Sequence, residues 1–189
     1  MGFRFKKSHG NNTALRNMVL GGMLIALGIL VPTMFHAVGL GKAFLPMHIP
    51  VLLSGFLCGP GVAALVGAAT PLLSAVLTGM PSLIPPVAQG MVAELCVYGF
   101  VTGYLFRKVG LGIYVTLFVS MLGGRIVYGV LAHFLLPLFG LPRVPLWAPL
   151  AMAFSESVPG LVVQVLLIPV LVSLLTGNTK MLMAIKRPR

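Results

Sequence analysis

Six apolar segments follow one another along the chain, separated by short stretches that are polar or rich in glycine and proline. Several have the roughly 20 residues that an α-helix needs to cross a bilayer. We therefore predict an all-α integral membrane protein with six membrane-spanning helices. The predicted spans cover residues 17–35, 46–58, 62–78, 87–106, 111–136 and 149–175. They form one membrane domain, 17–176, between basic tails at 1–16 and 177–189.

The stretch 44–91 holds the second and third spans back to back. Gly59-Pro60-Gly61 divides them, and this combination predicts a tight turn. Prolines also surround the two far ends of the pair, and His48 lies between Pro46 and Pro50 at the first of these ends. The second span is short, since its residues cover only about 20 Å as a helix.

The amino-acid composition is also typical of a membrane protein. Hydrophobic residues make up 58% of the chain and charged residues only 8%, whereas a soluble domain carries about 25% charged residues. The net charge of +11 does not indicate nucleic acid binding here. The cations lie at the ends of the apolar segments, where they orient a membrane protein and meet lipid headgroups.

The distribution of cations predicts that both termini are cytoplasmic. With the N-terminus inside, ten Lys and Arg residues lie inside, while Lys42 and Arg143 lie outside and Arg125 lies within the membrane, which accounts for all 13. Such an excess favours an even number of spans. We therefore expect a multi-pass protein of a prokaryotic cell membrane, with its 36–47, 79–86 and 137–148 loops outside.

Three ionisable residues lie deep inside the predicted spans. Glu94 and Glu156 are the only acids of the chain, each roughly 11 Å below the outer end of its span. Arg125 lies slightly deeper. Such groups are costly in lipid, so they face a protein interior or a cavity. Two interpretations stay open: a structural ion pair between Arg125 and one acid, or a polar ligand pocket that opens outward.

Other polar and aromatic residues are candidates for the same pocket. His36 and His48 flank the first outer loop, but two histidines without supporting acids are too few to indicate a metal site. Gln164 and His133 also lie within spans. We expect no metal and no cofactor. The predicted substrate-binding residues are His36, His48, Gln89, Glu94, Tyr98, Arg125, Tyr128 and Glu156.

The first span carries Gly22 and Ala26, two small residues four positions apart. This spacing lets another helix approach closely, either within the protein or from a partner. The sequence contains no HExxH, GxSxG or nucleotide-binding loop and no aspartate, so we do not expect an enzyme. A self-sufficient secondary carrier or channel and a membrane enzyme remain as hypotheses, and the enzyme is the less favoured of the two.

Three stretches carry a resemblance to a known family. They are LPMHIPVLLSGFLCGPGVAALVGAATPLLSAVLTGMP at 45–81, MVAELCVYGFVTGYLF at 91–106 and GGRIVYG at 123–129. Together with the length, the six spans and the Gly/Pro-rich outer loops, the chain resembles the substrate-binding S components of energy-coupling factor (ECF) vitamin transporters. The resemblance extends over nearly the whole chain.

The resemblance implies a mechanism and partners. An S component binds a vitamin or related micronutrient in an outward pocket, capped by the loop between the first two spans. It then docks on a transmembrane coupling subunit that works with two ATPase subunits, so ATP chemistry lies outside this chain. The family docks through an AxxxA face on the first span. Gly22 and Ala26 give GxxxA here, and with the resemblance counted we expect docking there.

The sequence leaves the substrate open. Pantothenate would use Arg125 for its carboxylate, whereas a cobamide precursor, a flavin or a queuosine precursor would use the acids and aromatic stacking. Neither the substrate nor the choice between ligand binding and mutual pairing of Glu94, Arg125 and Glu156 follows from the pattern.

Overall fold

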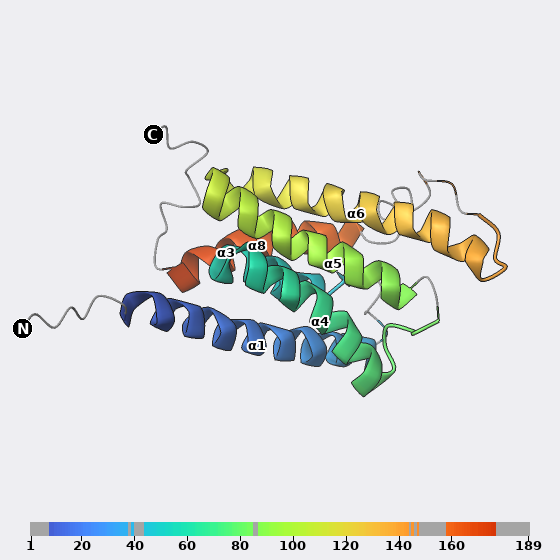
Figure 1. The fold of residues 1–189 in the computed structure, drawn as a ribbon, viewed down its shortest axis with the longest axis horizontal. Coiled ribbons are helices and arrows are strands. Elements are labelled where there is room, and N and C mark those ends of the chain that lie inside the picture. The colour runs from blue at the N-terminus through green and yellow to red at the C-terminus, as the bar shows by residue number, and fades with distance from the viewer. Residues whose placement is uncertain are drawn as a thin grey trace, which may run out of the picture.

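The computed structural model describes residues 8–37, 39, 44–84, 87–143, 145, 147 and 158–176, and the regular elements of this part of the chain are all helices, without strands (Figure 1). Each of the six predicted spans contains a helix. The helices are α1 (Ser8–Ala37), α3 (His48–Cys58), α4 (Pro60–Thr78), α5 (Val87–Tyr104) with the π-helical turn η1 (Leu105–Val109), α6 (Ile113–Leu138) and α8 (Val158–Thr176). The all-α class predicted from the sequence is confirmed.

The ends of the first and last helices differ from the predicted spans. α1 begins at Ser8 rather than near residue 17, so part of the predicted basic tail is helical. The first proline of the chain is Pro32, so no proline interrupts the helix before the apolar residues begin. The described part of the last predicted span begins at Val158, and residues 148–157 lie outside the described residues.

Successive helices run in opposite directions along the long axis of the molecule (Figure 1). The start of α1 and the end of α8 therefore lie at the same end. The predicted break between the second and third spans is confirmed: Gly59 has a positive φ of 91°, and Pro60 begins α4. Glycine suits such a backbone, and proline suits the first turn of a helix.

Side chains from other helices hold the C-terminal end of α3. Asn17 Nδ2 on α1 donates to the Cys58 carbonyl at 3.0 Å. Arg107 Nη1 on η1 donates to the Leu57 carbonyl, also at 3.0 Å. The last carbonyls of a helix have no partner within that helix, so these donors satisfy them and fix α3 against α1 and η1.

Small residues bring α4 and α5 into close contact. A Cβ at Gly67 of α4 would overlap the Leu95 carbonyl, and one at Gly99 of α5 would overlap the Ala63 carbonyl. Further along, Gly103 packs against Pro60. Because lipid gives helices no hydrophobic reason to associate, close packing of this kind is what holds them together.

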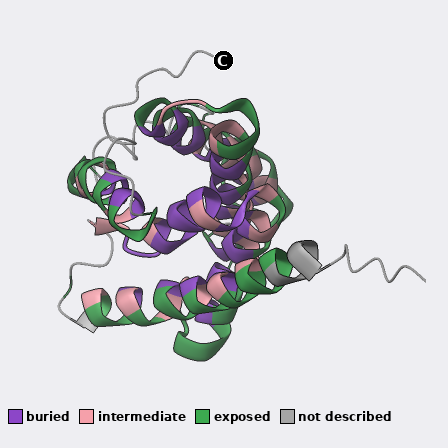
Figure 2. Cartoon of the chain, turned by 90° about the vertical axis from the view of Figure 1, so that its left-hand side faces the viewer, coloured by how far each residue is buried: buried purple, intermediate pink, exposed green. Residues whose placement is uncertain are grey.

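The buried residues lie where the helices face one another (Figure 2). Many large apolar side chains are exposed on the outer surface. α3 is the most enclosed helix and packs against α1, α4, α5 and α8. Within the described residues, four helices are long and apolar enough to cross a membrane: α1, α4, α6 and α8. α3 is shorter, and α5 carries Gln89 and Glu94, so a count of six spans stays a prediction.

Candidate functional site

Glu94 lies at the centre of a buried polar group, here called the Glu94 cluster, made of His48, Glu94, Tyr98 and Arg125. Arg125 Nη1 on α6 lies 3.2 Å from Glu94 Oε1, and His48 Nε2 on α3 lies 3.7 Å from the same oxygen. Of these side chains, only Arg125 is exposed by more than 2%, at 15%. The structure therefore pairs Arg125 with Glu94, one of the two acids that the sequence offered.

The cluster belongs to a polar stripe between α5 and α6. Glu94, Tyr98 and Thr102 are four residues apart and so share one face of α5. Next to Arg125, a Cβ at Gly124 of α6 would overlap the Tyr98 ring, so the glycine leaves space for the tyrosine side chain. One turn further, Thr102 Oγ1 donates to Ser120 Oγ at 2.9 Å. The antiparallel pairing of the two helices thus sets the position of Arg125 beside Glu94.

His48 enters the cluster from the start of α3. It is the first residue of that helix, and its ring meets the Tyr98 ring edge-on, with centroids 5.4 Å apart. Its backbone N–H donates to the Leu45 carbonyl at 3.0 Å, and its side chain is what brings the start of α3 to the carboxylate of Glu94.

Several atoms of the cluster have unused hydrogen-bonding capacity. Both ring nitrogens of His48, the Tyr98 hydroxyl, and Nε and Nη2 of Arg125 are buried and lack a hydrogen-bond partner among the described residues. At 3.7 Å, the contact from His48 to Glu94 is too long for a hydrogen bond. Buried polar atoms without partners are costly, so a polar ligand would be stabilised here.

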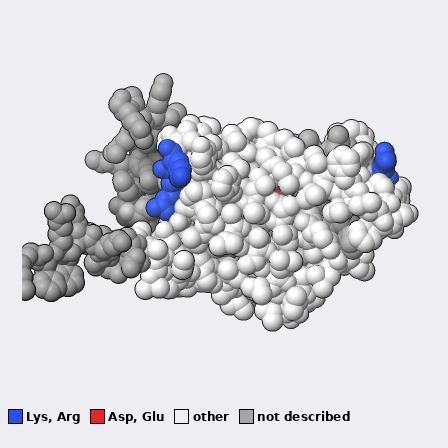
Figure 3. All heavy atoms as spheres, in the orientation of Figure 1, with Lys and Arg blue, Asp and Glu red and all other residues white. Residues whose placement is uncertain are grey.

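Charges are otherwise kept away from the middle of the molecule. On the face in Figure 3, the described Lys and Arg atoms lie at the two ends of the long axis, and one small acidic spot lies between them. Glu94 is the only acid among the described residues.

Comparison with protein families identifies the family of the chain. The family model of the ECF transporter, substrate-specific component, matches residues 16–173. The chain belongs to this family. It is a substrate-specific membrane subunit of an ECF transporter, in the prokaryotic cell membrane, and the resemblance seen in the sequence is confirmed. Neither the curated proteins nor the solved structures compared with it gave a match. ECF S components are transport-binding subunits, which is consistent with a chain that is not an enzyme.

The structure separates the predicted site residues of this S component into two groups. Tyr128 lies close to the cluster, because its ring packs against Gly90, one helical turn before Glu94. Gln89 is exposed and donates to the Leu83 carbonyl at 3.1 Å, and His36 is exposed at the end of α1. Neither is brought to the Glu94 cluster.

Two further predictions concern Glu156 and metal binding. Glu156 lies outside the described residues. Within the described residues, no three His, Cys, Asp or Glu side chains come together as a metal site would require. The expectation of no metal stays a prediction, as does each role in substrate binding.

Gln164 was not among the predicted site residues of the S component. It is fully buried on α8, on the same stripe as Gly160 and Ile168, and both of its amide atoms lack partners in the described part of the chain. The signal in the sequence was a glutamine within the most apolar of the spans. A buried amide without partners makes Gln164 a further candidate for binding a polar group.

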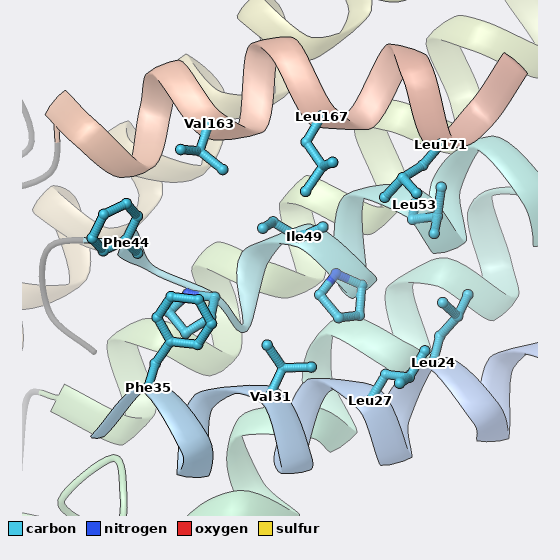
Figure 4. Close-up of a pocket in the computed structure, with 12 residues that line it drawn as sticks. Leu24, Leu27, Val31, Phe35, Phe44, Ile49, Leu53, Val163, Leu167 and Leu171 are labelled. Carbon is cyan, nitrogen blue, oxygen red and sulfur yellow. The ribbon is translucent and has the colours of Figure 1, made fainter. Parts of the chain in front are cut away.

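An apolar cleft of about 270 Å³ lies on the other side of α3 (Figure 4). α1 forms one wall and α8 the other, and Ile49 and Leu53 of α3 point into the space between them. The lining side chains are Leu24, Leu27, Val31, Phe35, Phe44, Pro46, Ile49, Pro50, Leu53, Val163, Leu167 and Leu171. None of them can donate or accept a hydrogen bond, so this cleft does not suit a polar substrate.

Proposed function

We propose that this S component binds a vitamin or vitamin precursor at the Glu94 cluster and delivers it to an ECF importer. The observation that supports this most is a set of buried polar atoms without partners, in a chain whose family binds transport substrates. Ligand pockets combine apolar walls with a few placed polar groups. The cluster offers such groups, with the Tyr98 ring as part of an apolar wall.

The proposed pocket opens to the outside, and both termini face the cytoplasm. Arg16 and Arg107 lie near the ends of α1 and α5 that meet α3 at Leu57 and Cys58. Arg143 follows the opposite end of α6. The sequence-wide excess of cations on the first side supports its assignment as the inside. His48, at the start of α3, then belongs to the outer half.

The partners in this proposal are a transmembrane coupling subunit and two ATPase subunits. α1 divides its small residues between two faces. Gly21 and Gly28 pack against Val62 and Thr70 of α4. Gly22 is different, because no atom lies within 4 Å of where its Cβ would be.

Ala26 is exposed on the same outward side of α1, one turn from Gly22. The large apolar side chains around these two small residues are also exposed: Leu15, Met18, Val19, Met23 and Leu30. Two small residues within such a surface leave a groove into which a partner helix can pack. We assign the coupling subunit to this face of α1.

Retained small molecules test the binding role. The purified chain, incubated with yeast extract and washed, should release a vitamin-like compound that mass spectrometry detects. The double variant Glu94→Gln/Arg125→Gln keeps the pair neutral while removing both charges, and it should release about tenfold less. Arg143→Gln, at an exposed position, is the matched control and should release as much as the wild type. Equal release from all three proteins would contradict the proposal.

A further inference from the structure

Arg125 presents one edge of its guanidinium without a partner. Its Nη1 faces Glu94 Oε1 at 3.2 Å, whereas Nε and Nη2 are buried and lack hydrogen-bond partners in the described part of the chain. These two nitrogens share an edge of the planar group, and their N–H bonds are parallel. Such an edge matches the two oxygens of a carboxylate or a phosphate.

The neighbouring groups also favour a ligand rich in acceptors. The Tyr98 hydroxyl can donate, and a neutral His48 ring carries one N–H. Glu94 Oε1 faces both Arg125 and His48 but makes no hydrogen bond with either, so it is one unused acceptor beside these donors. The unused capacity around Arg125 therefore consists mainly of donors.

Charge limits this ligand to a single negative charge. Arg125 is the only cation in the middle of a described helix, and it already faces the negative charge of Glu94. A phosphate monoester carries about −1.5 to −2 near neutral pH. Because the Arg125–Glu94 pair is already neutral, a phosphate monoester would leave nearly two uncompensated negative charges in a buried site, whereas a carboxylate leaves only one.

We propose that the substrate of this S component is a small organic acid whose carboxylate is bound by the Nε/Nη2 edge of Arg125. Glu94 is then a positioning residue that holds Nη1 and turns this edge toward the ligand. The inference rests on the proposed function, in which the Glu94 cluster is the substrate site. It selects vitamins and precursors with a carboxylate over neutral or cationic ones.

The test offers the purified chain matched pairs of compounds that differ at the carboxylate. Yeast extract is supplemented with equal amounts of pantothenate and pantothenol, nicotinate and nicotinamide, and biotin and biotin amide. Mass spectrometry then identifies what the washed protein retains. We expect an organic acid, and we expect its neutral amide, ester or alcohol counterpart to bind at least about tenfold more weakly, because a charged hydrogen-bond pair is lost.

Failure of this inference differs from failure of the proposed function. A neutral or cationic compound as the main retained species overturns the inference and leaves the proposed function intact. Retention of no compound contradicts the proposed function, and the inference with it.

A variant separates the shape of the guanidinium from its charge. Arg125→Lys keeps the positive charge but has no planar edge, so it should bind the retained acid at least about tenfold more weakly. Arg143→Lys is the matched control at an exposed arginine and should bind it as the wild type does. Wild-type affinity in Arg125→Lys overturns the inference. If that variant does not fold, the preference of the wild-type protein for the acid over its neutral counterpart in each pair still tests the inference.

Discussion

Glu94 and Arg125 form a buried ion pair whose two members depend on each other. Removing one partner of such a pair leaves an uncompensated charge, which typically costs about 3–5 kcal/mol. We therefore expect Glu94→Gln to lower the free energy of unfolding in detergent by roughly that amount. The double variant Glu94→Gln/Arg125→Met removes both charges and should recover much of the loss. A double variant as unstable as the sum of its two single variants would contradict the pairing.

Gly67 tests the close contact between α4 and α5. Its missing Cβ leaves room for the Leu95 carbonyl, which is backbone and cannot turn aside as a side chain can. Gly67→Ala should destabilise the protein by about 1–3 kcal/mol through overpacking. Gly61→Ala is the control, because no atom lies within 4 Å of that Cβ position. It should be neutral or stabilising, and thermal unfolding in the same detergent compares the two.

The sequence predicted part of the Glu94 cluster because burial of charge follows a simple rule. Ionisable residues avoid lipid, so Glu94 and Arg125 had to lie inside the protein. It was harder to predict from the sequence which side of a helix faces the interior of the protein. Gln89 precedes Glu94 by five residues, which turns it by about 140° around α5, and it is exposed. The partner of Arg125 and the closeness of His48 depend on how three helices pack, and no local pattern contains that information.

α3 packs against four other helices, and side chains from α1 and η1 donate hydrogen bonds to its C-terminal carbonyls. Removing one of these donors should make the C-terminal end of α3 open more often. Asn17→Ala takes away the half-buried donor to Cys58 and should cost about 1 kcal/mol. Hydrogen exchange should then speed up at the junction of α3 and α4. Asn17→Asp keeps the size but not the donor, so it should resemble Asn17→Ala. Unchanged exchange in both variants would show that the bond at 3.0 Å contributes nothing.

A separate prediction concerns docking of the coupling subunit on the outward face of α1. Gly22→Leu fills the groove from a Cβ position that has no atom of this chain within 4 Å, so stability and ligand retention should not change. Co-purification with the coupling subunit should fall by about tenfold or more, because close helix packing is lost. Gly61→Leu, at an equally open glycine on α4, is the control. Normal complex formation by Gly22→Leu would contradict docking at this face.

Helices were easier to predict from the sequence than their ends. Apolar segments and the Gly59–Pro60 break placed every described helix, because membrane spans need long apolar runs and prolines and glycines end them. α1 nevertheless begins at Ser8, since a polar segment can continue a helix beyond the lipid. Hydrophobicity marks where a helix meets lipid, and it does not mark where the helix itself begins.

For the whole molecule, the charge distribution predicts which end faces the cytoplasm. In a background with Cys58 and Cys96 replaced by alanine, Arg143→Cys should react with an impermeant maleimide in intact cells. Lys108→Cys should react only after the cells are opened. The two residues lie at opposite ends of α6, which has 26 residues and so spans about 39 Å. Equal labelling of both positions in intact cells would contradict the proposed orientation.

The most direct test of the account is an experimental structure of the purified chain with the small molecule that it retains. The chain offers two distinct places: the polar Glu94 cluster on one side of α3, and the apolar cleft between α1 and α8 on the other. We predict that the molecule lies within hydrogen-bonding distance of Arg125 and close to His48 and Tyr98. A molecule that lies in the apolar cleft, or that does not contact Arg125, would contradict the account.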